Sequence, residues 1–157
     1  GRGYRRVVAS PEPKSILCSK VIQQLSEAGT IIVAGGGGGV PVVKQADGTY
    51  KGIEAVIDKD RSGFKLAEEI KADTFMILTD VENVYVNYGK PDQKALTEIS
   101  LEEAQGYVDE GQFSAGSMGP KMEAAMNFAR TGGRAIICSL DKADLAMEGK
   151  SGTHIVG

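Results

Sequence analysis

The sequence has 157 residues, of which 41% are hydrophobic and 25% are charged, and its formal net charge is −3. These values are typical of one globular domain with a core of its own. The negative charge and the lack of a Lys/Arg run argue against general nucleic-acid binding, and no apolar run approaches the roughly 20 residues of a membrane span.

The first third of the chain is predicted to begin with a strand, a helix and a second strand. Residues 5–9 (Arg-Arg-Val-Val-Ala) are predicted to form a strand that stops at Ser10-Pro11-Glu12-Pro13, where two prolines exclude a helix. A helix is expected from about Ser15 to Ala28, and a buried parallel strand at Ile31–Ala34. The apolar positions of the helix follow its period: Leu17, Cys18, Val21, Ile22 and Leu25.

Five consecutive glycines, Gly35–Gly39, follow the second predicted strand. No Lys-Ser/Thr pair comes after them, so this is not a P-loop. Val40 and Pro41 come next instead of a helix, which excludes a dinucleotide-binding fingerprint. Backbone amides without side chains can approach an anion closely. A flexible linker is the alternative, and the apolar strands on both sides disfavour it.

A hairpin is predicted next, because Asp47-Gly48 separates the extended segments 42–44 and 50–53. The apolar run Val56-Ile57 then meets Asp58-Lys59-Asp60, and a helix is expected from about Arg61 to Ala72. Two carboxylates around one ammonium are costly to bury unless they pair, bind a metal or hold a substrate. The alternative interpretation is a solvated turn with a helix-capping Asp.

The strand predicted at Phe75–Leu78 ends in Thr79-Asp80-Val81, and a short extended excursion is expected at 84–88. A hydroxyl and a carboxylate at a strand's carboxyl end can contact a ligand in the crevice. Ser100-Leu101-Glu102-Glu103 is a capping box that predicts a helix to about Glu110.

The segment Phe113–Lys121 is broken by glycines and leads into a helix, with Pro120 in its first turn. Lys121 lies near the positive end of that helix dipole, so we expect an anionic partner close to it. A strand at Arg134–Ser139, a short helix at Lys142–Glu148 and a closing strand at His154–Val156 complete the chain.

Strands that alternate with helices predict a single α/β domain over residues 1–157, a three-layer αβα sandwich with a mainly parallel sheet. The glycine loop, Asp58-Lys59-Asp60, Thr79-Asp80 and the loop before Lys121 would then share one sheet edge. Lysines, bare amides and carboxylates without an evident nucleophile suit phosphoryl transfer. The lysines would stabilise charge, and a carboxylate would orient them or hold Mg²⁺ through water.

Cys18 and Cys138 are the only cysteines, and His154 is the only histidine. Both cysteines fall in apolar patterns, so we expect them to be buried and not disulfide-bonded, which is typical of a reducing, cytoplasmic setting. With one histidine, the sequence offers few residues for a Ser-His-Asp triad or a His-rich metal site.

Five segments in this order closely resemble carbamate kinase, of the amino acid kinase superfamily: Arg-Arg-Val-Val-Ala-Ser-Pro-Glu-Pro, Gly-Gly-Gly-Gly-Val-Pro-Val, Glu-Ala-Val-Ile-Asp-Lys-Asp, Ile-Leu-Thr-Asp-Val and Gly-Ser-Met-Gly-Pro-Lys. Ala9 stands where that family usually has proline. The resemblance implies the reaction carbamate + ATP = carbamoyl phosphate + ADP, run in cells mostly toward ATP. It also implies Mg²⁺, small-molecule substrates and a homodimer, with no nucleic-acid or membrane partner.

The resemblance also assigns residues. Lys121 would stabilise the transferring phosphoryl group, Lys59 would contact the phosphates, and Asp60 would hold the lysines. The nucleotide and the transferred group would be bordered by Gly36, Gly37, Gly38, Asp58, Thr79, Asp80, Val81, Tyr85, Ser114, Ala115 and Met118.

The chain resembles only the C-terminal, nucleotide-binding half of such an enzyme. In the family, the preceding half carries a further catalytic lysine and most of the carbamate pocket. The implied function is therefore the nucleotide-binding half of an ATP:carbamate phosphotransferase. The alternative is an isolated nucleotide-binding module or fragment that has no catalytic activity of its own.

Overall fold

The computed structural model describes residues 3–4 and 6–157, and its centre is a four-stranded sheet. The strand order is β3 (Thr74–Thr79), β7 (Arg134–Ser139), β8 (Thr153–Val156) and β6 (Glu98–Ser100). The β3–β7 and β6–β8 pairs are parallel, whereas β7 and β8 are antiparallel. The sheet is therefore mixed, and the prediction of a mainly parallel sheet is confirmed only in part.

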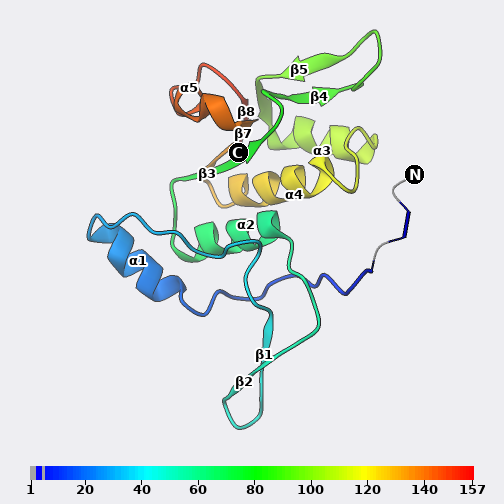
Figure 1. Ribbon diagram of the computed structural model, residues 1–157. Coiled ribbons are helices and arrows are strands. Elements are labelled where there is room, and N and C mark those ends of the chain that lie inside the picture. The colour runs from blue at the N-terminus through cyan, green and yellow to red at the C-terminus, as the bar shows by residue number, and fades with distance from the viewer. Residues whose placement is uncertain (1–2, 5) are drawn as a thin grey trace.

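Helices cover both faces of this sheet. On one face lie α2 (Lys59–Glu69), α4 (Met118–Ala129) and α3 (Leu101–Asp109), next to one another (Figure 1). On the other lies α5 (Ala143–Met147), which follows the short 3-10 turn η1 (Leu140–Lys142). Among the described residues, none of the helices has the length and apolar character of a membrane span.

The alternation of side chains along β7 explains the three layers. Ala135 and Ile137 join the large apolar cluster that includes Phe128 of α4. Ile136 and Cys138 point to the opposite face, where they pack with Ala146 of α5. Because both faces of β7 are covered, the predicted αβα sandwich is confirmed.

Local signals set the helix boundaries in this part of the chain. Asp58 caps α2, which begins at Lys59, two residues before the predicted start. The predicted capping box of α3 is present, since Ser100 accepts from the Glu103 amide and the Glu103 carboxylate accepts from the Ser100 amide. Pro120 lies in the first turn of α4, as predicted.

Two hairpins project from the sandwich. The predicted hairpin forms between β1 (Val42–Lys44) and β2 (Tyr50–Gly52), and the Asp47 carboxylate closes its turn by accepting from Thr49. A second hairpin pairs β4 (Val84–Val86) with β5 (Lys94–Leu96). Strand β6 was not predicted, because a segment of three residues carries too little periodicity to be recognised.

The strands predicted before the first hairpin are not formed. Residues 31–34 have no strand partner, and the side chains of Ile31 and Val33 are 96% and 98% exposed. Within 5–9 the structure has only a parallel bridge between Ala9 and Ala55, and Arg5 lies outside the described residues. A buried parallel strand needs neighbours on its sides, and the described residues supply none here.

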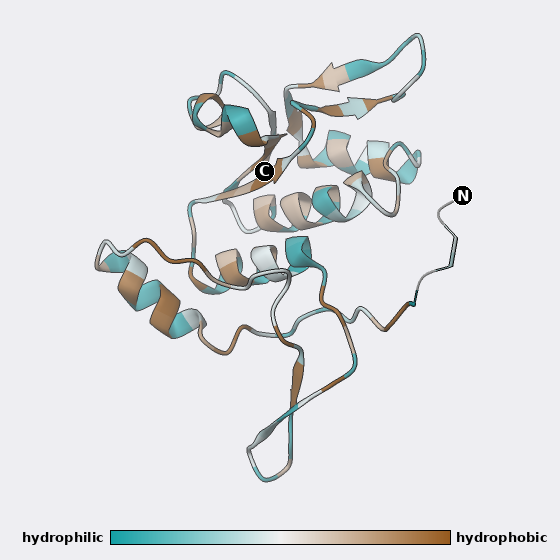
Figure 2. Ribbon diagram, viewed as in Figure 1, coloured by the Kyte–Doolittle hydropathy of each residue, from teal (hydrophilic) through white to brown (hydrophobic). Residues whose placement is uncertain are grey.

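The predicted first helix is α1 (Ser19–Glu27), but most of its apolar face is not buried. Ile22 is buried, whereas Leu17, Val21 and Leu25 are exposed. Cys18 is exposed as well, so the prediction that it is buried is wrong. Figure 2 shows hydrophobic stretches on α1 and on the segment that follows it, outside the sandwich.

The two cysteines should therefore differ in reactivity. Cys138 is buried, and burial raises the pKa of its thiol, so little reactive thiolate forms at mildly alkaline pH. We predict that an aromatic disulfide reagent titrates one thiol per folded chain rapidly and the second only in urea. Cys18→Ser should remove the rapid reaction. Two rapid thiols in the folded protein would contradict this arrangement.

Candidate active site

The carboxyl edge of the β3–β7 pair gathers four segments that are far apart in the sequence. A helix that precedes a parallel strand runs antiparallel to it, so α2 and α4 both begin at this edge. Thr79 and Ser139, the last residues of the two strands, are paired in the register. The first turn of α2, the end of β3, the first turn of α4 and the end of β7 therefore lie on one side of the molecule.

The carboxylate of Asp60 joins the first turns of the two helices. Its Oδ2 atom lies 3.0 Å from Lys121 Nζ and 3.3 Å from Lys59 Nζ. The side chains of Asp60 and Lys121 are only 8% and 11% exposed, whereas that of Lys59 is 58% exposed. Asp60 is thus the anionic partner predicted for Lys121, and the two ammonium groups lie on the same side of the molecule.

Electrostatics favour the charged form of Lys59 in this cluster. Asp60 lies in the first turn of α2, where the helix dipole stabilises a carboxylate. Partial burial lowers the pKa of Lys59, but the attraction of the Asp60 and Asp58 carboxylates outweighs it and raises the pKa overall. Lys59 is therefore a permanent cation at neutral pH.

Asp58 has a different task from its neighbours. Its Oδ1 atom accepts from the amides of Asp60 at 2.8 Å and Arg61 at 3.2 Å, which makes it the N-cap of α2. The capping interpretation therefore holds for Asp58, and the ion-pair interpretation holds for Lys59 and Asp60. The nucleotide contact predicted for Asp58 stays a prediction.

The glycine loop is held against the start of α2 through Gly38. The Ser62 hydroxyl donates to the Gly38 carbonyl oxygen at 2.6 Å. Gly38 has a φ of +132°, and a methyl group there would collide with the carbonyl oxygen of Ile57, so only glycine fits. Gly36 and Gly37 lie in the same turn and are exposed.

The Thr79-Asp80-Val81 segment follows β3 directly, and the Thr79 hydroxyl donates to the Asp80 carboxylate at 3.1 Å. Tyr85 lies in β4, and its ring centroid is 6.1 Å from that of Tyr88. On the way into α4, the Ser114 carbonyl accepts from the amides of Ser117 and Gly119. That turn leaves Ser114 and Ala115 exposed and Met118 half-buried.

Three groups of predicted residues thus share the sheet edge: the Asp60 cluster with Gly38, the 79–85 segment, and the 114–118 loop. Among the described residues, no hydrogen bond or ion pair between side chains joins the second or third group to the Asp60 cluster. The grouping therefore follows from the topology, and what each residue contacts in a complex stays a prediction.

The sequence model of the amino acid kinase family matches residues 4–139. The chain belongs to the amino acid kinase family. The chain is 57% identical over 157 residues to a carbamate kinase of Thermococcus kodakarensis. It is 53% identical over 158 residues to a carbamate kinase of Clostridium perfringens. Both alignments cover 99% of the chain and 50% of the relative.

Solved structures of family members agree with the sequence comparison. The carbamate kinase from Giardia lamblia bound to AMP-PNP superposes with a TM-score of 0.95 at 44% identity. That superposition covers 99% of this chain and 49% of the Giardia chain. The chain thus spans about half the length of the relatives that it matches.

Sequence reasoning missed two contacts at the edge of this amino acid kinase chain. Ser62 binds Gly38, and nothing in the sequence marks a pair that is 24 positions apart. Glu82 contacts Lys142 Nζ at 2.8 Å and accepts from the Ser151 hydroxyl at 3.1 Å. The Glu82 contact ties the loop after Thr79-Asp80 to the segment that follows β7.

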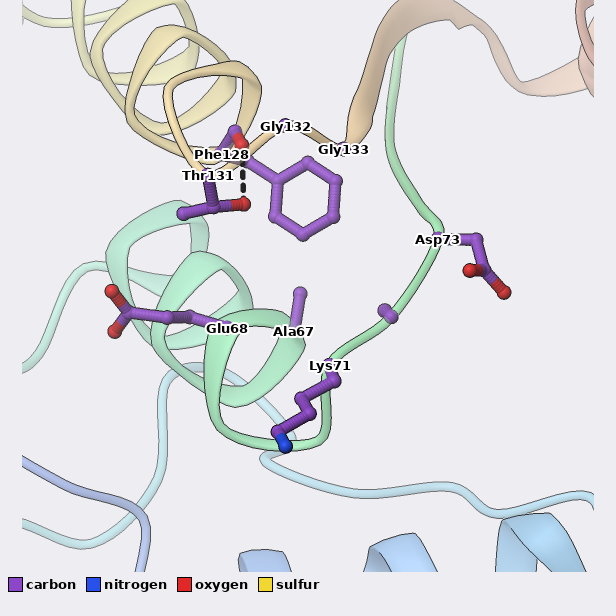
Figure 3. Close-up of a pocket in the computed structure, with 9 residues that line it drawn as sticks. Ala67, Glu68, Lys71, Asp73, Phe128, Thr131, Gly132 and Gly133 are labelled. Carbon is purple, nitrogen blue, oxygen red and sulfur yellow. Dashed lines mark hydrogen bonds between the residues drawn. The ribbon is translucent and has the colours of Figure 1, made fainter.

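A cavity of about 300 Å³ lies at the opposite sheet edge, between the ends of α2 and α4 (Figure 3). The ring of Phe128 lies beside Gly133, where a methyl group would collide with it. The Thr131 hydroxyl donates to the Phe128 carbonyl at 2.7 Å. This cavity belongs to the helix ends that lead into β3 and β7, and it is remote from the Asp60 cluster.

The described residues do not form a cage for a resident metal ion. They contain no group of three or more His, Cys, Asp or Glu side chains arranged to hold one. The Asp60 carboxylate is already engaged by two ammonium groups. These side chains therefore do not fit a resident magnesium ion.

Asp60→Asn tests the ion-pair cluster. The substitution leaves the largely buried Lys121 ammonium beside a neutral amide, so we predict a loss of about 2–4 kcal/mol in the free energy of unfolding. Urea denaturation followed by circular dichroism measures it. As a matched control, Glu148→Gln removes an exposed pair with Lys150 and should cause no measurable change. An equally small effect of Asp60→Asn would contradict the assignment.

Proposed function

We propose that this chain is the nucleotide-binding half of an ATP:carbamate phosphotransferase. In that reaction, a carbamate oxygen forms a bond to the γ-phosphorus of ATP. The bond from this phosphorus to the bridging oxygen breaks, which gives carbamoyl phosphate and ADP. The observation that carries the proposal is the convergence of Lys59 and Lys121 on the Asp60 carboxylate at the carboxyl edge of the sheet.

Phosphoryl transfer needs little covalent chemistry from the protein, and it depends on positioning and charge neutralisation. Lys121 would stabilise the transferring phosphoryl group, and the more exposed Lys59 would contact the phosphates. Asp60 would keep both ammonium groups oriented before the nucleotide binds. The first turns of α2 and α4 would add the positive ends of two helix dipoles.

The nucleotide would lie along the same edge. Thr79, Asp80, Val81 and Tyr85 would border it on one side, and the loop with Ser114, Ala115 and Met118 on the other. The Giardia carbamate kinase that this chain resembles is bound to AMP-PNP, which supports a nucleotide site in this half. Magnesium would enter with the nucleotide as MgATP, held by the phosphates.

The remaining part of the active site would come from a second segment of polypeptide. Three parts of the chain expose apolar side chains that soluble proteins normally cover. They are the extended runs around Val7-Val8 and Ile31–Val33 and the face of α1 with Leu17. The relatives have a further segment of similar length, which supports this segment as the cover. In this proposal the self-contained unit begins near Asp58, and the earlier residues pack on the second segment.

The predicted homodimer and the cytoplasmic location would be properties of the whole enzyme. The cysteines, Cys18 and Cys138, form no disulfide, which suits a reducing compartment.

The chain alone should bind ADP but turn over carbamoyl phosphate far more slowly than about 10 s⁻¹, a typical enzyme rate. Calorimetry measures binding, and a coupled ATP assay measures turnover. Mixing the chain with the segment of the Thermococcus relative that it does not cover should raise turnover. An ordinary rate for the chain alone would refute the need for a second segment, and binding without any rescued turnover would favour a non-catalytic module.

Lys121→Ala tests the main catalytic assignment in the mixed system. Loss of the ammonium should reduce turnover by at least about a hundredfold, because charge on the transferring group is no longer neutralised. Lys150→Ala, at an exposed ion pair, is the control and should leave the rate unchanged. A Lys121→Ala rate equal to that of the control would remove Lys121 from the mechanism.

A further inference from the structure

Ser62 lies in α2, two residues after Asp60, and its side chain is buried. Serine in a helix often bonds to the carbonyl four residues earlier. Here the amide of Ser62 uses that carbonyl, on Asp58, and the hydroxyl instead donates to Gly38 at 2.6 Å. The hydroxyl therefore joins the helix to the glycine loop.

Gly38 is the buried residue of a loop whose other glycines are exposed. Its amide donates to the Gly35 carbonyl at 3.0 Å, and its carbonyl accepts from Ser62. A methyl group at Gly38 would collide with the Ile57 carbonyl oxygen and lie 3.6 Å from the Lys59 amide nitrogen. Gly38 is thus fixed through both of its peptide groups, directly against the start of α2.

The other glycines of the loop have backbone amides that are free to bind a ligand. Among the residues that the structure describes, the amides of Gly36, Gly37 and Gly39 donate no hydrogen bond. Such amides can bind an anion, but only if the loop is held in a fixed place. Asp60 and Ser62 belong to one rigid stretch of helix, so the lysine cluster and the loop share the same support.

We propose that Ser62 is a positioning residue, whose hydroxyl holds the glycine loop so that its free amides face the phosphoryl group bound by Lys59 and Lys121. This inference rests on the proposed function. It concerns the loop and leaves the nucleotide contacts of the 79–85 segment unchanged. In this proposal Ser62 acts only through its bond to Gly38 and contacts neither the substrate nor the nucleotide.

The test compares Ser62→Ala with Ser62→Thr, which keeps the hydroxyl, and with Ser26→Ala, at an exposed serine of α1, as the control. Amide hydrogen exchange and titrations with inorganic phosphate and with ADP are followed by NMR on the ¹⁵N-labelled chain. Ser62→Ala should speed exchange at Gly38 about tenfold and weaken phosphate binding about tenfold, as expected for a lost buried hydrogen bond. The affinity for ADP should change by less than about twofold in every variant, since ADP lacks the transferred phosphoryl group.

Two further readouts separate positioning from general stability. Exchange at Ala67, a buried residue in the last turn of α2, should be unchanged in Ser62→Ala, whereas global destabilisation would speed exchange at Ala67 as much as at Gly38. Ser62→Thr should restore the wild-type exchange and phosphate affinity. Equal acceleration at Ala67 and Gly38, or no change at Gly38, would overturn the proposal.

Two more outcomes are decisive. If the wild-type chain binds neither ADP nor phosphate, the proposed function fails, and exchange at Gly38 still decides whether Ser62 holds the loop. If Ser62→Ala does not fold, Ser62→Cys weakens the same contact, because a thiol of similar size is a poorer donor than the hydroxyl. Faster exchange at Gly38 with unchanged exchange at Ala67 would then support the proposal, and unchanged exchange at Gly38 would overturn it.

Discussion

The contact between Asp60 and Lys121 is the constraint on which the site depends. A lysine in the first turn of a helix faces the positive end of the dipole, and a second lysine beside it adds repulsion. The buried Asp60 carboxylate offsets both effects from the first turn of the neighbouring helix. It can do so because α2 and α4 each precede a strand of one parallel pair and therefore begin at the same edge.

A buried ion pair of this kind adds little net stability, because desolvation of the charges offsets their attraction. In the proposed function, its value lies in holding two cations close together where a polyphosphate would bind. Lys121 is set deeply and is fixed by Asp60, whereas Lys59 is exposed and can follow an incoming phosphate. The glycine loop, held through Gly38, adds neutral donors beside the same charges.

Local chemistry made much of the sandwich predictable from the sequence. The capping box at Ser100 and the cap at Asp58 act within a few residues, and the dipole argument required an anion near Lys121. The strand predicted at 31–34 failed because pairing depends on neighbours that the described residues do not supply. The Ser62–Gly38 contact could not be predicted, since a serine in a helix carries no mark of a distant partner.

The most direct measurement is a crystal structure of the chain soaked with a non-hydrolysable ATP analogue. We predict that the terminal phosphate lies within hydrogen-bond reach of both Lys59 and Lys121 Nζ, with the nucleoside between the Thr79-Asp80 segment and the Ser114 loop. Density for the nucleotide at another edge of the sheet, or phosphates that contact neither lysine, would contradict it.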